Sequence, residues 1–251
     1  MRLITLNIWG GTVYDPLIKF LQKYSKTTDI FCFQEILKGG NGKTNRGETK
    51  SSYEDIENIF TDYIGYFSEY GEGGYYSESS KNLDFDYGVV CFVKKSCKQS
   101  FVGGVSLYNP ERKWNDYSGR FAAGSSIAIT VSDYVIVNVH GLWQGSVKVD
   151  TEARLEQSKR IIDLANKIEG KKIICGDFNL EPHTESIKMI ESLPMKNLIK
   201  EYKVTSTRSS FYDKDVKFSD YVFVDYDVNV LNFQVLPDEV SDHLPLLLEF
   251  E

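Results

Sequence analysis

Asp177 and Asn179 follow a short apolar run, and their residue types could take part in chemistry. The run with its flanks reads Lys171-Lys172-Ile173-Ile174-Cys175-Gly176-Asp177-Phe178-Asn179. An apolar run this short, bounded by charge and glycine, is typical of a buried strand. Residues two apart on an extended chain point the same way, so the acid and the amide could face one cavity. The alternative interpretation is that they satisfy an ordinary turn.

Other apolar runs repeat this arrangement, with a polar residue beside the run. These residues are Asn7, Glu35, His140, Asp220 and the adjacent pair Asp242 and His243. Ligand sites of open α/β sheets lie at the carboxyl ends of strands, which makes these residues candidates for one shared site. Individually, an Asp before a strand is often a turn residue, and a histidine on an apolar run is often a core residue. His183 is expected to be an exposed loop residue.

If these groups converge, their negative charge must be neutralised. The acids concerned are Glu35, Asp177, Asp220 and Asp242. An unpaired, partly buried carboxylate costs several kcal/mol, and no lysine or arginine lies at the motif positions. A divalent metal would supply the missing charge. Glu35, Asp242 and the amide oxygen of Asn7 are hard oxygen donors, which suit Mg²⁺ or Mn²⁺ and not Zn²⁺.

A metal with two histidines and several acids indicates phosphoester hydrolysis. A positioned general base accelerates a reaction by ~10²–10⁴, whereas hydrolysis of a phosphate monoester requires up to about 10²¹. Metal charge on the phosphoryl oxygens and in-line positioning must provide most of the remainder. The chemistry therefore needs oxygen ligands for the metal and histidine for the proton in one cleft.

The elements that would position these residues alternate along the chain. Strands are predicted at residues 3–8, 29–35, 88–93, 126–131, 134–140, 171–177, 221–224, 228–235 and 244–250. Helices are predicted at residues 15–24, 56–63, 151–169 and 185–193. Asp15 is expected to cap the first helix with Pro16 at its first position, and Gly170 to end the third. This alternation predicts an α/β layered protein with mixed sheets.

Composition limits the class of protein. The 251 residues are 41% hydrophobic and show no composition break, so a single domain over residues 1–251 is expected. A net charge of -7 argues against a protein that coats nucleic acid by charge alone. No secretion signal or membrane span is recognisable, and the four cysteines are scattered. We expect a cytoplasmic monomer with reduced thiols.

Six short blocks stand in order along the chain. They are Thr5-Leu6-Asn7, Phe33-Gln34-Glu35, Asn138-Val139-His140, Gly176-Asp177-Phe178-Asn179, Ser219-Asp220-Tyr221 and Ser241-Asp242-His243. Together they resemble the endonuclease/exonuclease/phosphatase superfamily, which includes deoxyribonuclease I, exonuclease III type AP endonucleases and sphingomyelinases. The blocks cover nearly the whole chain. The resemblance implies a four-layer α/β sandwich, with two mixed β-sheets flanked by helices and the site at one edge.

The resemblance implies a role for each matching position. Glu35 and Asn7 resemble metal ligands, Glu35 being the principal one, and Asp242 is implied to contact the metal. His243 resembles the histidine that acts as general base or binds the scissile phosphate. Asp220 resembles the acid that orients this histidine.

The remaining matched residues surround the reacting phosphorus in the family's pattern. Asp177 and Asn179 are implied to align the nucleophile and to stabilise the pentacovalent phosphorus. His140 matches a histidine of the nuclease and sphingomyelinase branches, which contacts phosphate or delivers a proton to the leaving oxygen. The division of acid and base roles between His140, His243 and Asp177 is left open, as is the number of metals.

Departures from the family's patterns indicate which branch of the superfamily the sequence resembles. AP endonucleases typically continue Gln-Glu with Thr-Lys, whereas Gln34-Glu35 continues here with Ile36-Leu37. The Asn-then-Pro pattern of Asn179 to Pro182, with Arg154 and Gln157 on the preceding helix, looks more like the tyrosyl-DNA phosphodiesterase and generic bacterial branches. Arg154 itself is interpreted as a solvated helix residue.

These observations predict a Mg²⁺-dependent phosphodiesterase, with Mn²⁺ as a possible substitute, that acts on nucleic acid or its ends by attack of an activated water. Trp143, three residues past His140, is the expected base-stacking residue, and Trp9 and Trp114 are further candidates, unless these are core aromatics. The alternative is a phosphatase or phosphodiesterase for a small-molecule or lipid phosphoester, which the acidic net charge favours. A non-catalytic binding domain would lack a principal site residue, and all are present.

Overall fold

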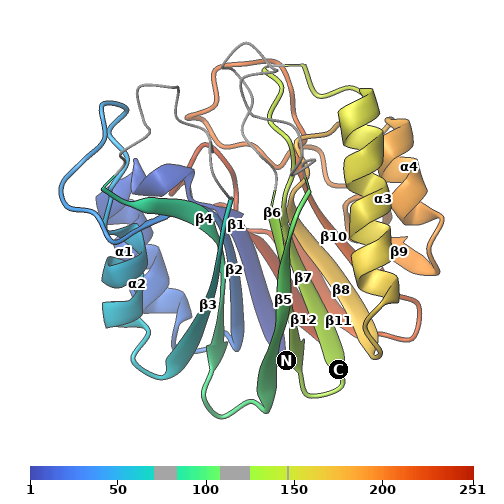
Figure 1. Ribbon diagram of the computed structural model, residues 1–251, viewed down its shortest axis with the longest axis horizontal. Coiled ribbons are helices and arrows are strands. Elements are labelled where there is room, and N and C mark those ends of the chain that lie inside the picture. The colour runs from blue at the N-terminus through green and yellow to red at the C-terminus, as the bar shows by residue number, and fades with distance from the viewer. Residues whose placement is uncertain (71–83, 108–124, 146) are drawn as a thin grey trace.

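The computed structural model describes residues 1–70, 84–107, 125–145 and 147–251. These residues form two six-stranded mixed sheets that pack face to face, with helices on both outer sides (Figure 1). The predicted four-layer α/β sandwich is therefore confirmed. Both termini lie at the edge of the sheets opposite to the polar strand ends (Figure 1).

The first sheet carries the N-terminal part of the chain. In sheet order its strands are β11 (Val230–Val235), β12 (Leu246–Phe250), β1 (Arg2–Asn7), β2 (Ile30–Lys38), β4 (Asp86–Lys94) and β3 (Tyr63–Glu69). Only β1 and β2 are parallel in this described sheet. Helices α1 (Tyr14–Tyr24) and α2 (Ser52–Ile59) cover its outer face, where Leu17, Phe20 and Ile56 pack against alternate strand residues.

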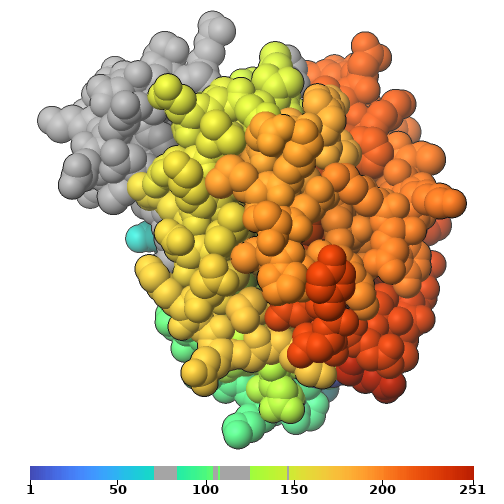
Figure 2. Space-filling view, turned by 90° about the vertical axis from the view of Figure 1, so that its right-hand side faces the viewer, coloured from blue at the N-terminus to red at the C-terminus, as the bar shows by residue number. Residues whose placement is uncertain are grey.

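The second sheet carries most of the remaining chain. In sheet order its strands are β5 (Gln99–Ser106), β6 (Ser125–Val131), β7 (Tyr134–His140), β8 (Lys171–Asp177), β10 (Asp220–Asp225) and β9 (Met195–Asn197). The predicted tight turn at residues 132–133 joins β6 to β7. Helices α3 (Glu152–Asn166) and α4 (Glu185–Glu191) cover the outer face (Figure 2), and α5 (Leu198–Glu201) follows β9.

The inner faces of the two sheets enclose one apolar core, crossed near the polar edge by two amides. The Nε2 of Gln34 on β2 donates to Oδ1 of Asn138 on β7 over 2.5 Å. Asn138 Nδ2 in turn donates to the carbonyls of Phe33 and Val90, each at 3.0 Å. Both amide side chains are fully buried. Because an unpaired buried amide is costly, these bonds fix how the sheets face each other directly behind the polar strand ends.

Several element ends differ from the sequence-based expectations. Helix α1 begins at Tyr14 with Val13 as its N-cap, so Asp15 lies in the first turn, where its charge still favours the helix dipole. Helix α3 ends at Asn166. Gly170 therefore does not cap it. Gly170 has φ +129°, and a Cβ there would lie 3.0 Å from the carbonyl of Asp133, so glycine allows the close approach of the β6–β7 turn.

The second predicted helix was displaced toward the C-terminus, since residues 56–63 were predicted and α2 spans Ser52–Ile59, and three strands were missed. Helix α2 ends at Ile59, and Tyr63 begins β3, with its hydroxyl donating to the carbonyl of Ser25 at 2.8 Å. Apolar spacing alone does not separate the last turn of a helix from the first residues of a strand. The edge strands β3 and β5 and the short β9 lack the long apolar runs that mark the central strands.

The structure also describes the cysteines and the length of the helices. All four cysteines are free, and three of them, Cys32, Cys91 and Cys175, are buried between the sheets, as expected for reduced thiols. Within the described ranges, no helix is both long enough and apolar enough to cross a bilayer.

The buried amide pair generates a stability prediction. Replacing Asn138 by Ala takes the side-chain donor from the buried carbonyls of Phe33 and Val90. It also removes one of three acceptors of Gln34 Nε2, which keeps Thr5 Oγ1 and the carbonyl of Cys32. Each buried carbonyl that loses its donor costs about 1–3 kcal/mol. We expect Asn138→Ala to lower the free energy of unfolding in urea by roughly 3 kcal/mol. Asn229→Ala is the matched control, because Asn229 is exposed and its amide donates only to Glu251 at the surface. Equal losses in both variants would contradict the assignment.

Candidate active site

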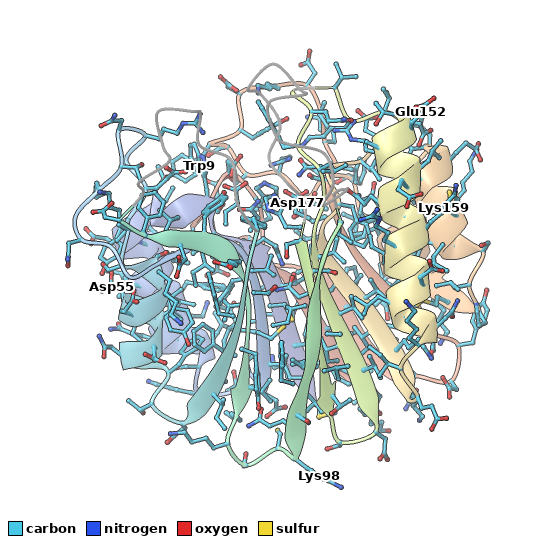
Figure 3. The ribbon with its side chains drawn as sticks, viewed as in Figure 1. Trp9, Asp55, Lys98, Glu152, Lys159 and Asp177 are labelled. Atoms are coloured by element: carbon cyan, nitrogen blue, oxygen red, sulfur yellow. The ribbon has the colours of Figure 1, made fainter. Side chains whose placement is uncertain are left out.

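The strand directions bring the polar strand ends to one edge of the sandwich. Strands β7 and β8 are parallel and end there, and the antiparallel β10 begins there, so His140, Asp177 and Asp220 form one row in register. In the first sheet β1 ends at Asn7, and Asp242-His243 precede its antiparallel neighbour β12. Figure 3 shows Asp177 at this edge between the two sheets, with Trp9 nearby above the first sheet.

Glu35 reaches this edge through a β-bulge. The register between β2 and β4 shifts between Phe33 and Ile36, and Glu35 adopts a φ of +56°. A left-handed conformation is uncommon for a residue with a side chain, and such positions cluster at functional sites. The bulge re-aims the carboxylate, whose Oε1 accepts from Asn7 Nδ2 at 3.1 Å and lies 3.5 Å from Nε2 of His140 on the second sheet.

Asp177 lies at the centre of the site and is 1% exposed. Its Oδ1 accepts from the hydroxyl of Ser219 and from the backbone N–H of Asn179, and its Oδ2 accepts from Asn7 Nδ2 at 3.1 Å. Burial alone would raise the pKa of Asp177. The surrounding charges, led by His243 and Lys148, outweigh burial and hold the pKa well below its usual range. Asp177 is therefore ionised at neutral pH.

His243 and Asp220 form a buried pair next to Asp177. The Nδ1–H of His243 donates to both carboxylate oxygens of Asp220, at 2.8 and 2.9 Å, and Thr207 Oγ1 donates to the same carboxylate at 2.8 Å. The Nε2 of His243 lies 3.6 Å from Asp177 Oδ2. Burial and Arg208 lower the pKa of His243, but the nearby acids, with Asp220 first among them, raise it above its usual value.

His140 is held by Tyr70, a residue that the sequence did not indicate. The Tyr70 hydroxyl lies 2.5 Å from His140 Nδ1 and also accepts the backbone N–H of Glu35 at 3.2 Å. The Tyr70 hydroxyl can therefore donate its own proton to Nδ1 of His140. Nδ1 is then the acceptor, so the proton of the neutral ring lies on Nε2. Nε2 lies 3.5 Å from Glu35 Oε1 and 3.8 Å from Asp177 Oδ2. Burial lowers the pKa of His140 to about 4, so the ring is neutral at pH 7.

Two buried cations enter the site from outside the motif positions, which themselves hold no lysine or arginine. Lys148 is 3% exposed and donates to Oδ1 of Asn179, and Arg208 Nη1 lies 2.5 Å from His243 Nε2. Neither lies within a motif block, because both come from loops that tertiary packing brings inward. For Lys148, its place between two valines is the one feature of the sequence that could have indicated burial. The sequence around Arg208 offers no such feature.

Asn179 and Arg154 have positions that the sequence did not foresee. The amide of Asn179 donates to the carbonyl of Gly141 at 2.9 Å while its oxygen receives Lys148. The amide group thus holds two loops together. Arg154 is not solvated, since it is 1% exposed and donates to the carbonyls of Val147 and Val149 at 2.8 and 2.7 Å. Arg154 thereby fixes the segment that carries Lys148.

A pocket of about 250 Å³ opens over these residues. Two of the three tryptophans considered for base stacking, Trp143 and Trp9, line it, and Trp114 lies outside the described residues. The loop between α5 and β10 contributes Arg208, Phe211, Tyr212, Asp213 and Lys214. His183 lies away from the site and is exposed, as expected.

The predicted ligands form an oxygen-rich corner that fits a hard divalent cation. Burial, followed by the charge of Asp242, raises the pKa of Glu35 to about 7, although the hydrogen bond from Asn7 lowers it. A carboxylate that resists ionisation beside another acid lacks a counter-charge. Asn7 differs from expectation in one respect: its amide oxygen accepts the N–H of Trp9 at 2.9 Å, and its nitrogen faces Glu35.

A second group of potential ligand atoms fits a metal less well. Atoms of Asp177, Asp220 and His243 lie within 4.8 Å of one another. His243 has no ring nitrogen to offer, because Nδ1 donates to Asp220 and Nε2 faces Arg208. The corner at Glu35 is therefore the better metal candidate.

The fold and this edge together define a hydrolase of the α/β-sandwich class. The chain belongs to the Endonuclease/Exonuclease/phosphatase family, whose model matches residues 4–243. The resemblance carried by the six blocks is thus confirmed. Members of this family are typically hydrolases that use divalent metal ions.

Solved structures support the fold. A mannosyl-6-phosphatase of Bacteroides thetaiotaomicron is 17% identical, with a TM-score of 0.67 over 100% of this chain and 99% of its own. The human Nocturnin catalytic domain with bound sulfate is 17% identical, with a TM-score of 0.66 over 100% and 94%. Humanized D. rerio TDP2 is 14% identical, with a TM-score of 0.62 over 100% and 98%. These likenesses show the fold alone. No curated protein sequence matches the chain.

The Tyr70 contact generates a prediction about His140. Tyr70→Phe removes the O–H that donates to Nδ1, so the ring is expected to populate both neutral tautomers in ¹⁵N NMR spectra and turnover to fall on the order of tenfold. Tyr87→Phe is the control, because the Tyr87 ring packs on Tyr70 with centroids 4.7 Å apart. A single unchanged tautomer in Tyr70→Phe would show that the hydroxyl does not set the proton position.

The raised pKa of Glu35 generates a prediction for the metal-free protein. The folded state binds the Glu35 proton more tightly than the unfolded state, so stability falls as pH rises from about 5 to about 7. Glu35→Gln removes this dependence, and its stability relative to wild type is expected to improve by about 3 kcal/mol between pH 5 and pH 8. Denaturant titrations in EDTA measure this, with the exposed Glu152→Gln as control. Parallel pH profiles for Glu35→Gln and wild type would exclude the assigned shift.

Proposed function

We propose that the protein is a Mg²⁺-dependent phosphoester hydrolase that works by in-line attack of an activated water. The observation that carries this proposal is the convergence of an ionised Asp177, the His243–Asp220 pair and the uncompensated Glu35 carboxylate at one edge. Residues from Asn7 to His243 take part, so we also propose that residues 1–251 act as one catalytic domain.

The metal would be held by Glu35 and Asp242. Asn7 can offer its oxygen to an ion only if its amide group turns over, since the nitrogen faces Glu35 now. A bound divalent ion supplies positive charge to the phosphoryl oxygens. Mn²⁺ suits the same oxygen ligands.

His243 is the proposed base for the attacking water. Asp220 takes its Nδ1–H, which leaves Nε2 as the acceptor, and the raised pKa suits a base near neutral pH. Arg208 must move off Nε2 before this nitrogen can accept a proton, because a guanidinium donor now faces it.

Asp177 and His140 have complementary proposed roles. Asp177 stays ionised and orients the water as a hydrogen-bond acceptor, and Asn179 holds Lys148 in place beside it. His140 is neutral, so it acts through an Nε2–H hydrogen bond to a phosphoryl or leaving oxygen and does not transfer a full proton from an imidazolium at pH 7.

Two substrate classes have support. The rim of Trp9, Trp143 and the 47% exposed Phe211 supports bases stacked at a nucleic-acid end. The net charge of -7 and the buried cations support a small phosphoester, and one structure with the same fold is a mannosyl-6-phosphatase. The cytoplasmic location and the monomeric state are proposals of the same kind.

A substrate panel tests the proposed function. Nuclease substrates, phospholipids and bis-p-nitrophenyl phosphate are each incubated with the protein in Mg²⁺, Mn²⁺ or EDTA. We expect hydrolysis that requires a divalent ion in at least one class. Hydrolysis that persists in EDTA would exclude the metal-dependent reaction.

A histidine comparison tests the assigned base. His243→Ala is expected to lower kcat/KM on the order of 10²-fold or more, without loss of the cooperative thermal unfolding transition. His183→Ala removes an imidazole that is 70% exposed at its side chain and is the matched control. Undiminished turnover in His243→Ala would rule out its role as base.

A further inference from the structure

Lys148 and Arg208 place two positive charges in the pocket. The proposed hydrolysis gives neither of them a contact with the substrate. Lys148 comes from the segment after β7 and Arg208 from the loop before β10, and both line the same pocket. They are 3% and 9% exposed. Moving a charged group from water into such a site costs several kcal/mol unless an opposite charge accompanies it.

The direct partner of Lys148 among the described residues is neutral. Its Nζ donates to the amide oxygen of Asn179, which leaves two ammonium N–H donors. Burial lowers the pKa of Lys148 to about 8, with Arg208 as a further lowering charge and Asp177 as an opposing one. The ammonium stays protonated at neutral pH, although the two cations repel each other.

Arg208 is also weakly compensated. Its Nη1 faces a histidine nitrogen at 2.5 Å and the carboxylate of Asp242 at a long 3.4 Å, and its buried Nε has no hydrogen-bond partner within the described structure. The Tyr212 ring stacks on the guanidinium with 4.1 Å from Cζ to the centroid, which fixes its plane. A planar fork with free donors matches the oxygens of a phosphoryl group.

We propose that Lys148 and Arg208 form an anion clamp for a terminal phosphate, so that the site prefers phosphate monoesters to phosphodiesters. This inference rests on the proposed phosphoester hydrolysis. A monoester presents three non-bridging oxygens and up to two negative charges, whereas a diester presents two such oxygens and one charge. One oxygen would meet the charge of the divalent ion that Glu35 and Asp242 would hold, and the other two would each meet one of the two cations.

A diester would fit this clamp poorly. Its second ester group would occupy the place of the third oxygen and leave one buried cation against an uncharged carbon substituent. In the monoester reaction the water oxygen bonds to phosphorus, the bond to the alcohol oxygen breaks, and that oxygen leaves with a proton. Inorganic phosphate and an alcohol are the products. The aromatic rim at Trp9 and Trp143 would contact the alcohol portion.

Two chromogenic esters test the clamp on the full chain in Mg²⁺. The ratio of kcat/KM for p-nitrophenyl phosphate to that for bis-p-nitrophenyl phosphate is measured for wild type, Arg208→Gln and Lys148→Met. Each variant is expected to lower this ratio by about tenfold or more. The monoester engages both cations and loses one charge-assisted hydrogen bond, whereas the diester engages one cation and can keep its bond to the cation that remains. Lys159→Gln is the charge-matched control, because Lys159 lies on the outer side of α3 (Figure 3) and should leave the ratio unchanged.

Calorimetric binding provides a readout that needs no turnover. At pH 7.5 inorganic phosphate is mainly dianionic, diethyl phosphate is monoanionic and Lys148, with a pKa of about 8, is mainly protonated. Wild type is therefore expected to bind inorganic phosphate more tightly. Lys148→Met and Arg208→Gln should each weaken phosphate binding by about tenfold. Thermal unfolding of each variant checks its fold. If Arg208→Gln does not fold, Lys148→Met and Arg208→Lys decide the question, since the latter keeps the charge and loses the fork.

The two levels of the proposal fail in distinguishable ways. If folded wild type binds inorganic phosphate through Lys148 and Arg208 but hydrolyses neither ester with any divalent ion, the hydrolase proposal is wrong and the clamp stands. If both esters are hydrolysed and the variants lower both rates equally, or leave both unchanged, the clamp is overturned and the hydrolase proposal stands.

Discussion

The negative charge held on the buried carboxylate of Asp177 is the constraint around which this edge of the molecule is organised. Burial opposes that charge, and the surrounding imidazoles and cations overcome the opposition. The same groups would be unfavourable in an apolar interior without Asp177, so acid and bases stabilise one another mutually. The hydroxyl of Ser219 and the backbone of Asn179 hold the carboxylate in one orientation. Each neighbour therefore has a defined place relative to this residue.

The sandwich provides this arrangement because strand ends from two sheets meet at one border. A sheet alone would align His140, Asp177 and Asp220 in a row with nothing opposite. The facing sheet adds Glu35 through a bulge, and the Gln34–Asn138 amides hold the two layers in register just behind it. The geometry of the site is thus a property of the interface between the sheets and not of either sheet.

The sequence predicted the residues whose positions follow from strand patterns. Asn7, His140 and Asp177 end apolar strands, so strand direction alone brings them to a shared border. Tyr70 and Arg208 were not predictable in this way, because they lie in segments without periodicity and act through partners remote in sequence. Arg154 was misread for a related reason: its helix spacing is visible in the sequence, but the carbonyls that it binds belong to a loop.

Arg154 links the outer layer of the molecule to the pocket. It lies in the first turn of α3, next to the N-cap Thr151, and its guanidinium binds the carbonyls on both sides of Lys148. The position of the Lys148 ammonium therefore depends on the N-terminus of α3, which lies outside the pocket. The ends of a helix open most readily. Fraying of this first turn would release the segment of residues 147–149, which carries Lys148, while both sheets stay intact. On heating, Lys148 would then leave its place in the pocket at a lower temperature than that of global unfolding. The stability of the Thr151 cap would set the difference between the two temperatures.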